Sequence, residues 1–132
     1  MIGMMGISDV ISRAEAILPG LPALDGENDP RWHAIIAVGE YVESHPHDVW
    51  QFVARWGKSE DRDLQIAIAT CLLEHLLEHH FELLFPAISA LANSDRNFAH
   101  AFLACWKLGQ ANLPGNRERF DALTVECRHK KS

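Results

Sequence analysis

Three aspartates recur at a nearly constant spacing, and this repeat constrains the fold more than any other feature of the chain. Asp29, Asp61 and Asp95 lie 32 and then 34 residues apart, and an arginine follows each of them within two positions. Three residues after each aspartate the same apolar rhythm begins, in the series Trp32, Ile35, Ile36, Gly39; Leu64, Ala67, Ile68, Cys71; and Phe98, Ala101, Phe102, Cys105. A period of this size indicates an array of helical repeats. Such arrays typically offer extended binding surfaces, so the pattern favours binding over catalysis.

The composition is that of a folded, acidic protein. The chain has 132 residues, is 48% hydrophobic and 23% charged, and suits one domain. Its formal net charge of −6 repels phosphate backbones, so nucleic acid is not an expected partner and a basic or neutral protein is favoured. No apolar run approaches transmembrane length, and no membrane association is expected.

The cysteines indicate a reducing compartment. There are three, without a CxxC spacing, which favours free thiols in a cytoplasmic protein over a disulfide framework. Cys71 and Cys105 fall on apolar helix faces and are expected to pack as small hydrophobes. Cys127 lies in a polar stretch, where we expect an exposed thiol. The apolar residues 1–7 are too few for a signal-peptide core.

Apolar residues at helical spacing, bounded by turn signals, predict seven helices and no strand. Ser8 is a plausible N-cap for the first helix, and the Asp29-Pro30 pair is a strong start signal for the second. The predicted helices are 8–18, 30–44, 46–58, 62–78, one holding 84–91, 96–108 and 117–126. Since each helix pair has too little apolar surface to fold alone, neighbouring pairs must stack.

The repeat divides one domain, 1–132, into consecutive units. These are a capping helix and linker (1–28), repeat 1 (29–60), repeat 2 (61–94), a degenerate repeat 3 (95–126) and a basic, frayed tail (127–132). The third unit is called degenerate because Leu113-Pro114-Gly115 interrupts it. We expect the first helix to cover the open end of repeat 1.

The segment 85–98, with the sequence FPAISALANSDRNF, resembles the junction between two HEAT repeats. HEAT repeats typically carry a proline-led second helix, an Asp-containing turn and a next helix with small residues at its packing positions. Trp50 and Leu84 each lie 11 residues before the next repeated aspartate, and alanines fill the packing positions at Ala67, Ala69, Ala99, Ala101 and Ala104. The resemblance implies an all-α fold: a short right-handed α-solenoid of about three HEAT-like helix pairs with an N-terminal capping helix. The large Trp106 departs from this pattern.

One motif could carry metal chemistry. His75, Glu78 and His79 match H-x-x-E-H, in which two histidines four apart on a helix can bind zinc and the glutamate can act as general base. Together with Glu82 they share one flank of the helix. Peptidases of this type are far larger and take another acidic ligand from a distant helix. We therefore expect a polar, solvated helix end and no cofactor, and keep a metal-binding protein or metal-dependent hydrolase as an alternative.

The function favoured by the sequence is a non-enzymatic protein-binding module. HEAT arrays generally present their second helices to a partner, which predicts a surface made of Asp48, Gln51, Arg55, Lys58, Glu82, Ser89, Asn93, Arg117, Arg119 and Asp121. The mixed charges favour a protein partner over a polyanion. Small size and acidity suit an inhibitor or immunity-type protein, or an adaptor, that binds a basic protein.

Two further alternatives remain open. One is a HEAT-like nucleic-acid-binding or repair protein. HEAT-like DNA glycosylases line a concave groove with Lys and Arg, whereas the basic residues of this chain are scattered apart from the terminal run 128–131. A homodimer is the other, since the ends of a short array expose apolar faces unless they are capped.

Trp32, Trp50 and Trp106 are expected in packing positions, and Trp56 at the end of its helix is the candidate surface anchor.

Overall fold

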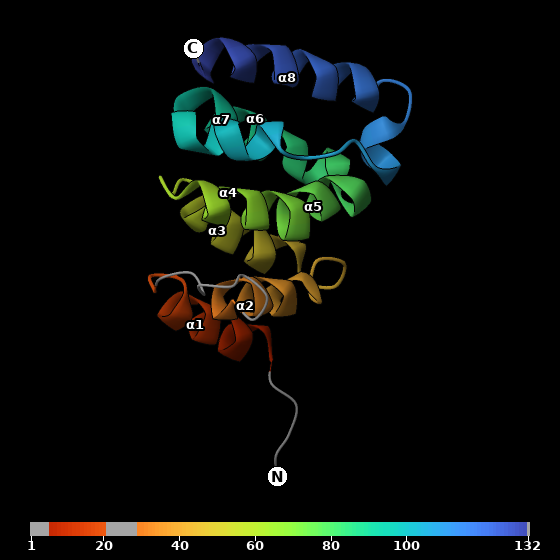
Figure 1. The fold of residues 1–132 in the computed structure, drawn as a ribbon. Helices are drawn as coiled ribbons and strands as arrows, with labels where there is room; N and C mark the ends of the chain where they lie inside the picture. Colours follow the sequence, from red (N-terminus) through yellow and green to blue (C-terminus); the bar gives the residue numbers. More distant parts are fainter. Residues whose placement is uncertain (1–5, 21–28, 132) are drawn as a thin grey trace.

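The computed structural model describes residues 6–20 and 29–131, and these are all-helical, with no strand in either range. The helices follow one another through the molecule in chain order, with α1 at one end and α8 at the other (Figure 1). They are α1 (Ile7–Ile17), α2 (Pro30–Gly39), α3 (Pro46–Trp56), α4 (Arg62–Ile68), the π-helical turn η1 (Ala69–Leu73), α5 (Glu74–His79), α6 (Phe81–Ser94), α7 (Arg96–Leu103), the 3₁₀ turn η2 (Gly109–Asn112) and α8 (Asn116–Lys131). The expected all-α class is confirmed. The linker residues 21–28 lie outside the described ranges.

Each of the three repeated aspartates caps a helix. The Asp29 carboxylate accepts a hydrogen bond from the amide of Arg31 at 2.9 Å. Asp61 and Asp95 do the same for α4 and α7, at 3.0 Å and 2.9 Å to the nearest amide. These bonds satisfy amides that have no partner inside their own helix. The predicted starts of α2, α4 and α7 are therefore confirmed.

The cap of α1 and the place of Pro86 differ from what the sequence predicts. Gly6 is the N-cap of α1, so Ser8 lies inside that helix and does not cap it. Helix α6 begins at Phe81, whose amide donates to the Gln110 side chain at 3.0 Å, and Pro86 lies within the helix and does not lead it. A cap supplied from 29 residues away leaves no local sequence signal.

Three helices end well before or well after the predicted residue. Helix α2 ends at Gly39, because the amides of residues 40–42 bond carbonyls three positions back and tighten the chain into turns. Helix α7 ends at Leu103, beyond which the amide of Trp106 donates to the Glu74 carboxylate at 2.8 Å. Helix α8 continues to Lys131, so the basic segment is helical here and not frayed.

The predicted helix 62–78 contains an irregularity that the periodicity does not reveal. Its middle, Ala69–Leu73, is a π-helical turn between α4 and α5. Helix α2 packs against this turn. Gly39 permits the close approach, since a Cβ there would lie 3.2 Å from the carbonyl oxygen of Cys71.

One hydrophobic core runs through the molecule from Ala14 on α1 to Cys127 on α8. The thiol of Cys127 is fully buried, so the expectation of an exposed cysteine is wrong. Trp106 is 72% exposed, so its expected packing position is wrong as well. Trp32, Trp50 and Trp56 are partly buried against the core. Both residues lie in the C-terminal third of the chain, where α7 ends earlier and α8 ends later than predicted.

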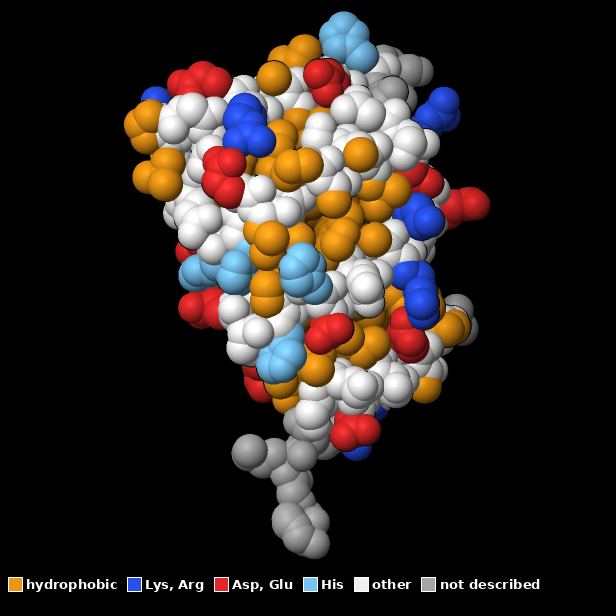
Figure 2. Space-filling model, turned by 180° about the vertical axis from the view of Figure 1, so that it is seen from behind, with side chains coloured by type: hydrophobic (Ala, Val, Ile, Leu, Met, Phe, Trp, Pro, Cys, Tyr) orange, Lys and Arg blue, Asp and Glu red, His pale blue; other side chains and the backbone are white. Residues whose placement is uncertain are grey.

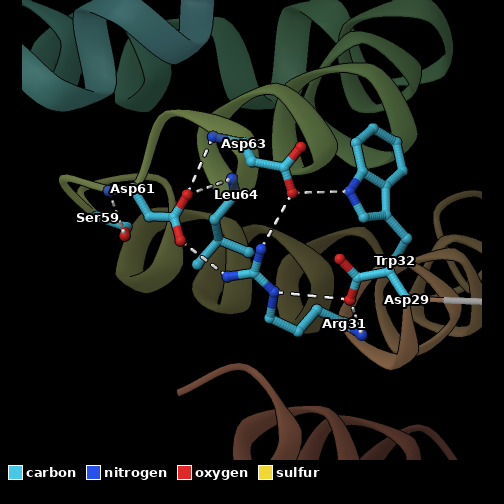
Figure 3. A network of polar contacts seen from close by, with 7 residues as sticks. All are labelled: Asp29, Arg31, Trp32, Ser59, Asp61, Asp63 and Leu64. Carbon is cyan, nitrogen blue, oxygen red and sulfur yellow. Dashed lines mark hydrogen bonds and ion pairs between the residues drawn. The ribbon is translucent and has the colours of Figure 1, made fainter. Parts of the chain in front are cut away.

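A buried arginine joins the first two repeats (Figure 3). Arg31 is 2% exposed, and its guanidinium donates to Asp61 at 2.8 Å and to Asp63 at 3.0 Å. Its Nε lies 3.7 Å from the buried carboxylate of Asp29. The indole nitrogen of Trp32 donates to Asp63 at 3.0 Å. The start of α2 is thereby bound to the start of α4.

We expect Arg31→Met to lower the free energy of unfolding by about 3 kcal/mol, because it removes one partner of a buried ion pair and leaves the carboxylate of Asp29 buried without it. Urea denaturation followed by circular dichroism measures this. Arg62→Met is the matched control, since Arg62 also follows a capping aspartate but is exposed. A loss below about 1 kcal/mol for Arg31→Met, the range of exposed pairs, would contradict the assignment.

A second prediction concerns pH. The hydrogen bond from Arg31 lowers the pKa of Asp61, and the backbone amides of Leu64 and Asp63 act in the same direction. A carboxylate with a lowered folded pKa stabilises the fold above its unfolded pKa, and this contribution is lost as the pH falls through the folded pKa. Asp61→Asn should therefore be less stable than wild type at neutral pH, and the difference should shrink well below pH ~4. Urea denaturation midpoints of the variant and the wild type, measured at neutral pH and well below pH ~4, test this prediction. Glu60→Gln is the control, since Glu60 is exposed. A stability difference that does not change with pH would refute the prediction.

Candidate functional site

The second helices of the first two repeats, α3 and α6, lie behind α4, α5 and α7 in Figure 1, and the opposite view shows their face (Figure 2). Every predicted binding residue on α3 or just after it is exposed, namely Asp48, Gln51, Arg55 and Lys58. Arg55 forms an ion pair with Glu15 of α1, and the Trp56 indole donates to the same carboxylate at 3.3 Å. Asp48 and Gln51 line a small hollow of about 130 Å³ beside this pair. Trp56 thus supports the α1–α3 contact.

The predicted residues of α6 and α8 form a second group. Glu82 pairs with Arg119 at 3.1 Å, and the guanidinium of Arg119 lies over the rings of Phe81 and Phe85 at 5.3 and 5.0 Å from their centroids. The Asn93 amide donates to the Ser89 carbonyl oxygen at 3.0 Å and to Glu126 at 3.1 Å. Arg117 and Asp121 are exposed, and Asp121 pairs with Lys107 at 2.6 Å. Many of these polar groups therefore bind one another.

Helix α6 also carries an apolar feature that sequence reasoning missed. Leu83, Pro86, Ala87 and Ala90 are all exposed on α6, and we call them the α6 strip. Leu83, the largest of the four side chains, is 52% exposed. Figure 2 shows apolar side chains at several places on this face, among charged side chains and histidines. The sequence signal of the α6 strip is the spacing i, i+3, i+4, i+7 of its four residues. Helical periodicity does not single out this side of the helix, because the opposite side of α6 is apolar as well.

The H-x-x-E-H motif forms a local hydrogen-bonded group. The His75 Nδ1 lies 2.8 Å from a carboxylate oxygen of Glu78, and the His79 Nε2 lies 3.5 Å from the same oxygen. Glu82, expected on the same flank, turns instead to Arg119. Within the described residues no group of three or more His, Cys, Asp or Glu side chains is arranged to hold a metal ion. The geometry gives the metal-site alternative no support.

His75 and His79 also border a groove, which we call the α2–α5 groove. It has a volume of about 450 Å³ and is bounded by the end of α2, the turn that follows, η1 and α5. Its lining residues are Ile36, Gly39, Glu40, Val42, Glu43, Thr70, Cys71, His75 and His79. Burial raises the pKa of the Cys71 thiol, so this group stays neutral at physiological pH. The groove is separate from the α6 strip.

No family model, curated protein or solved structure matches this chain. Among the helices of the described ranges, none combines the length and apolar character needed to cross a membrane.

Proposed function

We propose that this chain is a non-enzymatic protein-binding module that receives its partner on the face of α3 and α6. The observation that carries the proposal is the α6 strip. Scattered exposed apolar residues are ordinary, but a row of four along one helix is not. Contiguous apolar surface with polar surroundings is typical of protein interaction sites.

The surroundings of the strip support this role. The Glu82–Arg119 pair joins α6 to α8 on the helix that carries the strip, and Gln51, Arg55 and Lys58 are exposed on or just after α3, where Gln51 and Arg55 lie toward α1. An apolar centre with a polar, solvated rim is the usual anatomy of a protein–protein interface. The rim carries both signs of charge, which suits a folded protein better than a polyanion.

The proposed architecture is a short HEAT-like α-solenoid. Repeated aspartate caps at 32- and 34-residue spacing, and helix pairs that follow one another in chain order, support it. Such arrays present second helices as a binding surface. An inhibitor, immunity-type or adaptor role for a basic partner in the cytoplasm follows from small size, acidity and free cysteines.

Nucleic-acid binding has less support from the geometry. Arg31, Arg55, Lys107 and Arg119 each form an ion pair with a carboxylate. Such pairing reduces the positive potential that a phosphate backbone needs. The overall charge of −6 acts in the same direction.

We expect Leu83→Asp to weaken partner binding about tenfold or more, because it places a charge at the apolar centre of the interface, and tenfold corresponds to ~1.4 kcal/mol. The measurement is a quantitative pull-down from the host's lysate with the stoichiometric partner identified by mass spectrometry. Leu113→Asp is the matched control, since Leu113 is also 52% exposed but lies in the loop before α8. Both variants should keep the wild-type melting temperature, because the replaced side chains are exposed.

Equal capture by the two variants would refute the placement on α6. Sedimentation of the purified proteins separates the homodimer alternative: a concentration-dependent dimer lost only in Leu83→Asp would identify a second copy as the occupant. A wild-type monomer that captures one other protein agrees with the proposal.

A further inference from the structure

The α2–α5 groove has a composition that selects its occupant. Its most exposed apolar side chain is Ile36, which is 53% exposed although it lies on the helix that carries the buried Ile35 and Val38. Its volume of about 450 Å³ falls within the range of pockets that hold a ligand or a few side chains. Gly39 lines the groove at the point where α2 approaches η1 closely.

One rim of the groove is negatively charged. Glu40 and Glu43 line it, both are exposed, and neither side chain forms a hydrogen bond or ion pair with a described residue. On the opposite wall lies His75, whose Nδ1 is 2.8 Å from the carboxylate of Glu78. No lysine or arginine is among the lining residues. A cation in the groove would therefore meet uncompensated carboxylates.

The spacing of these groups matches a helical or extended peptide lying along α2. Ile36, Glu40 and Glu43 all line the groove, in order from the last turn of α2 through the turns that follow it. An occupant alongside would present one apolar and two cationic side chains in a complementary order, as amphipathic helices do in grooves. The wall opposite is the π-helical turn, a distortion that often accompanies functional sites.

We propose that the α2–α5 groove binds a basic amphipathic segment of a protein partner, with Lys or Arg side chains against Glu40 and Glu43 and an apolar side chain against Ile36. This site uses different helices from the α6 strip. It therefore stands or falls independently of the function proposed above.

The test uses two fluorescein-labelled synthetic peptides of about four helical turns. They share their Leu and Ala positions, and one carries Lys where the other carries Glu. Fluorescence anisotropy with the full chain should show binding of the Lys peptide only. Glu40→Gln with Glu43→Gln should weaken that binding about tenfold, at ~1.4 kcal/mol. Added salt should also weaken it, because the contacts are exposed charges.

The matched control is Asp9→Asn with Glu60→Gln, which changes the net charge equally at two exposed carboxylates outside the groove. It should bind the Lys peptide like wild type. Chemical-shift changes on adding the peptide should centre on Ile36, Gly39 and Cys71. Equal weakening by both double variants, binding of the Glu peptide, or shifts confined to α3 and α6 would each overturn the proposal, as would no binding of either peptide.

Discussion

The packing of the first two repeats against each other depends on the buried guanidinium of Arg31. A charge removed from water needs charged or hydrogen-bonded partners, and Arg31 finds them at the beginning of α4, in Asp61 and Asp63. Asp61 at the same time caps α4 through its other oxygen. One carboxylate thus begins a helix and binds the neighbouring repeat, so that the helix start and the packing of the two repeats are fixed together.

The second position after each repeated aspartate has a different residue in every unit: Arg31, Asp63 and Asn97. Arg31 reaches forward to Asp63, which occupies the equivalent place in the next unit. The Asn97 amide reaches back to the carbonyl oxygen of Lys58 at 3.1 Å. The same position in each unit therefore contacts another unit. Because its residue differs from unit to unit, the cation of Arg31 can meet the carboxylate of Asp63, a pairing that identical repeats could not provide.

Local signals predicted the helix starts and failed where a distant group decides the outcome. An aspartate cap bonds amides two or three residues away, so Asp29, Asp61 and Asp95 are visible in the sequence. The end of α7 depends on Glu74, 32 residues from Trp106, and the burial of Cys127 depends on how α8 crosses the core. The polar candidates on α3 were placed on the surface correctly, but the α6 strip was missed because helical periodicity separates apolar from polar faces and α6 is apolar on both.

The two surfaces follow from one asymmetry of the helix pairs. Helix α6 buries Phe81, Phe85 and Ile88 on one side and still leaves Leu83 in solvent, so its composition exceeds what the core of this chain requires. Helix α2 does the same with Ile36 beside the buried Ile35 and Val38, and the turn after it carries Glu40 and Glu43, which form no ion pair with a described residue. The strip on α6 has paired charges at its edge, whereas the groove beside α2 is lined by carboxylates without a Lys or Arg among its lining residues. Shape and apolar area would therefore govern recognition at the strip, and charge would govern it at the groove.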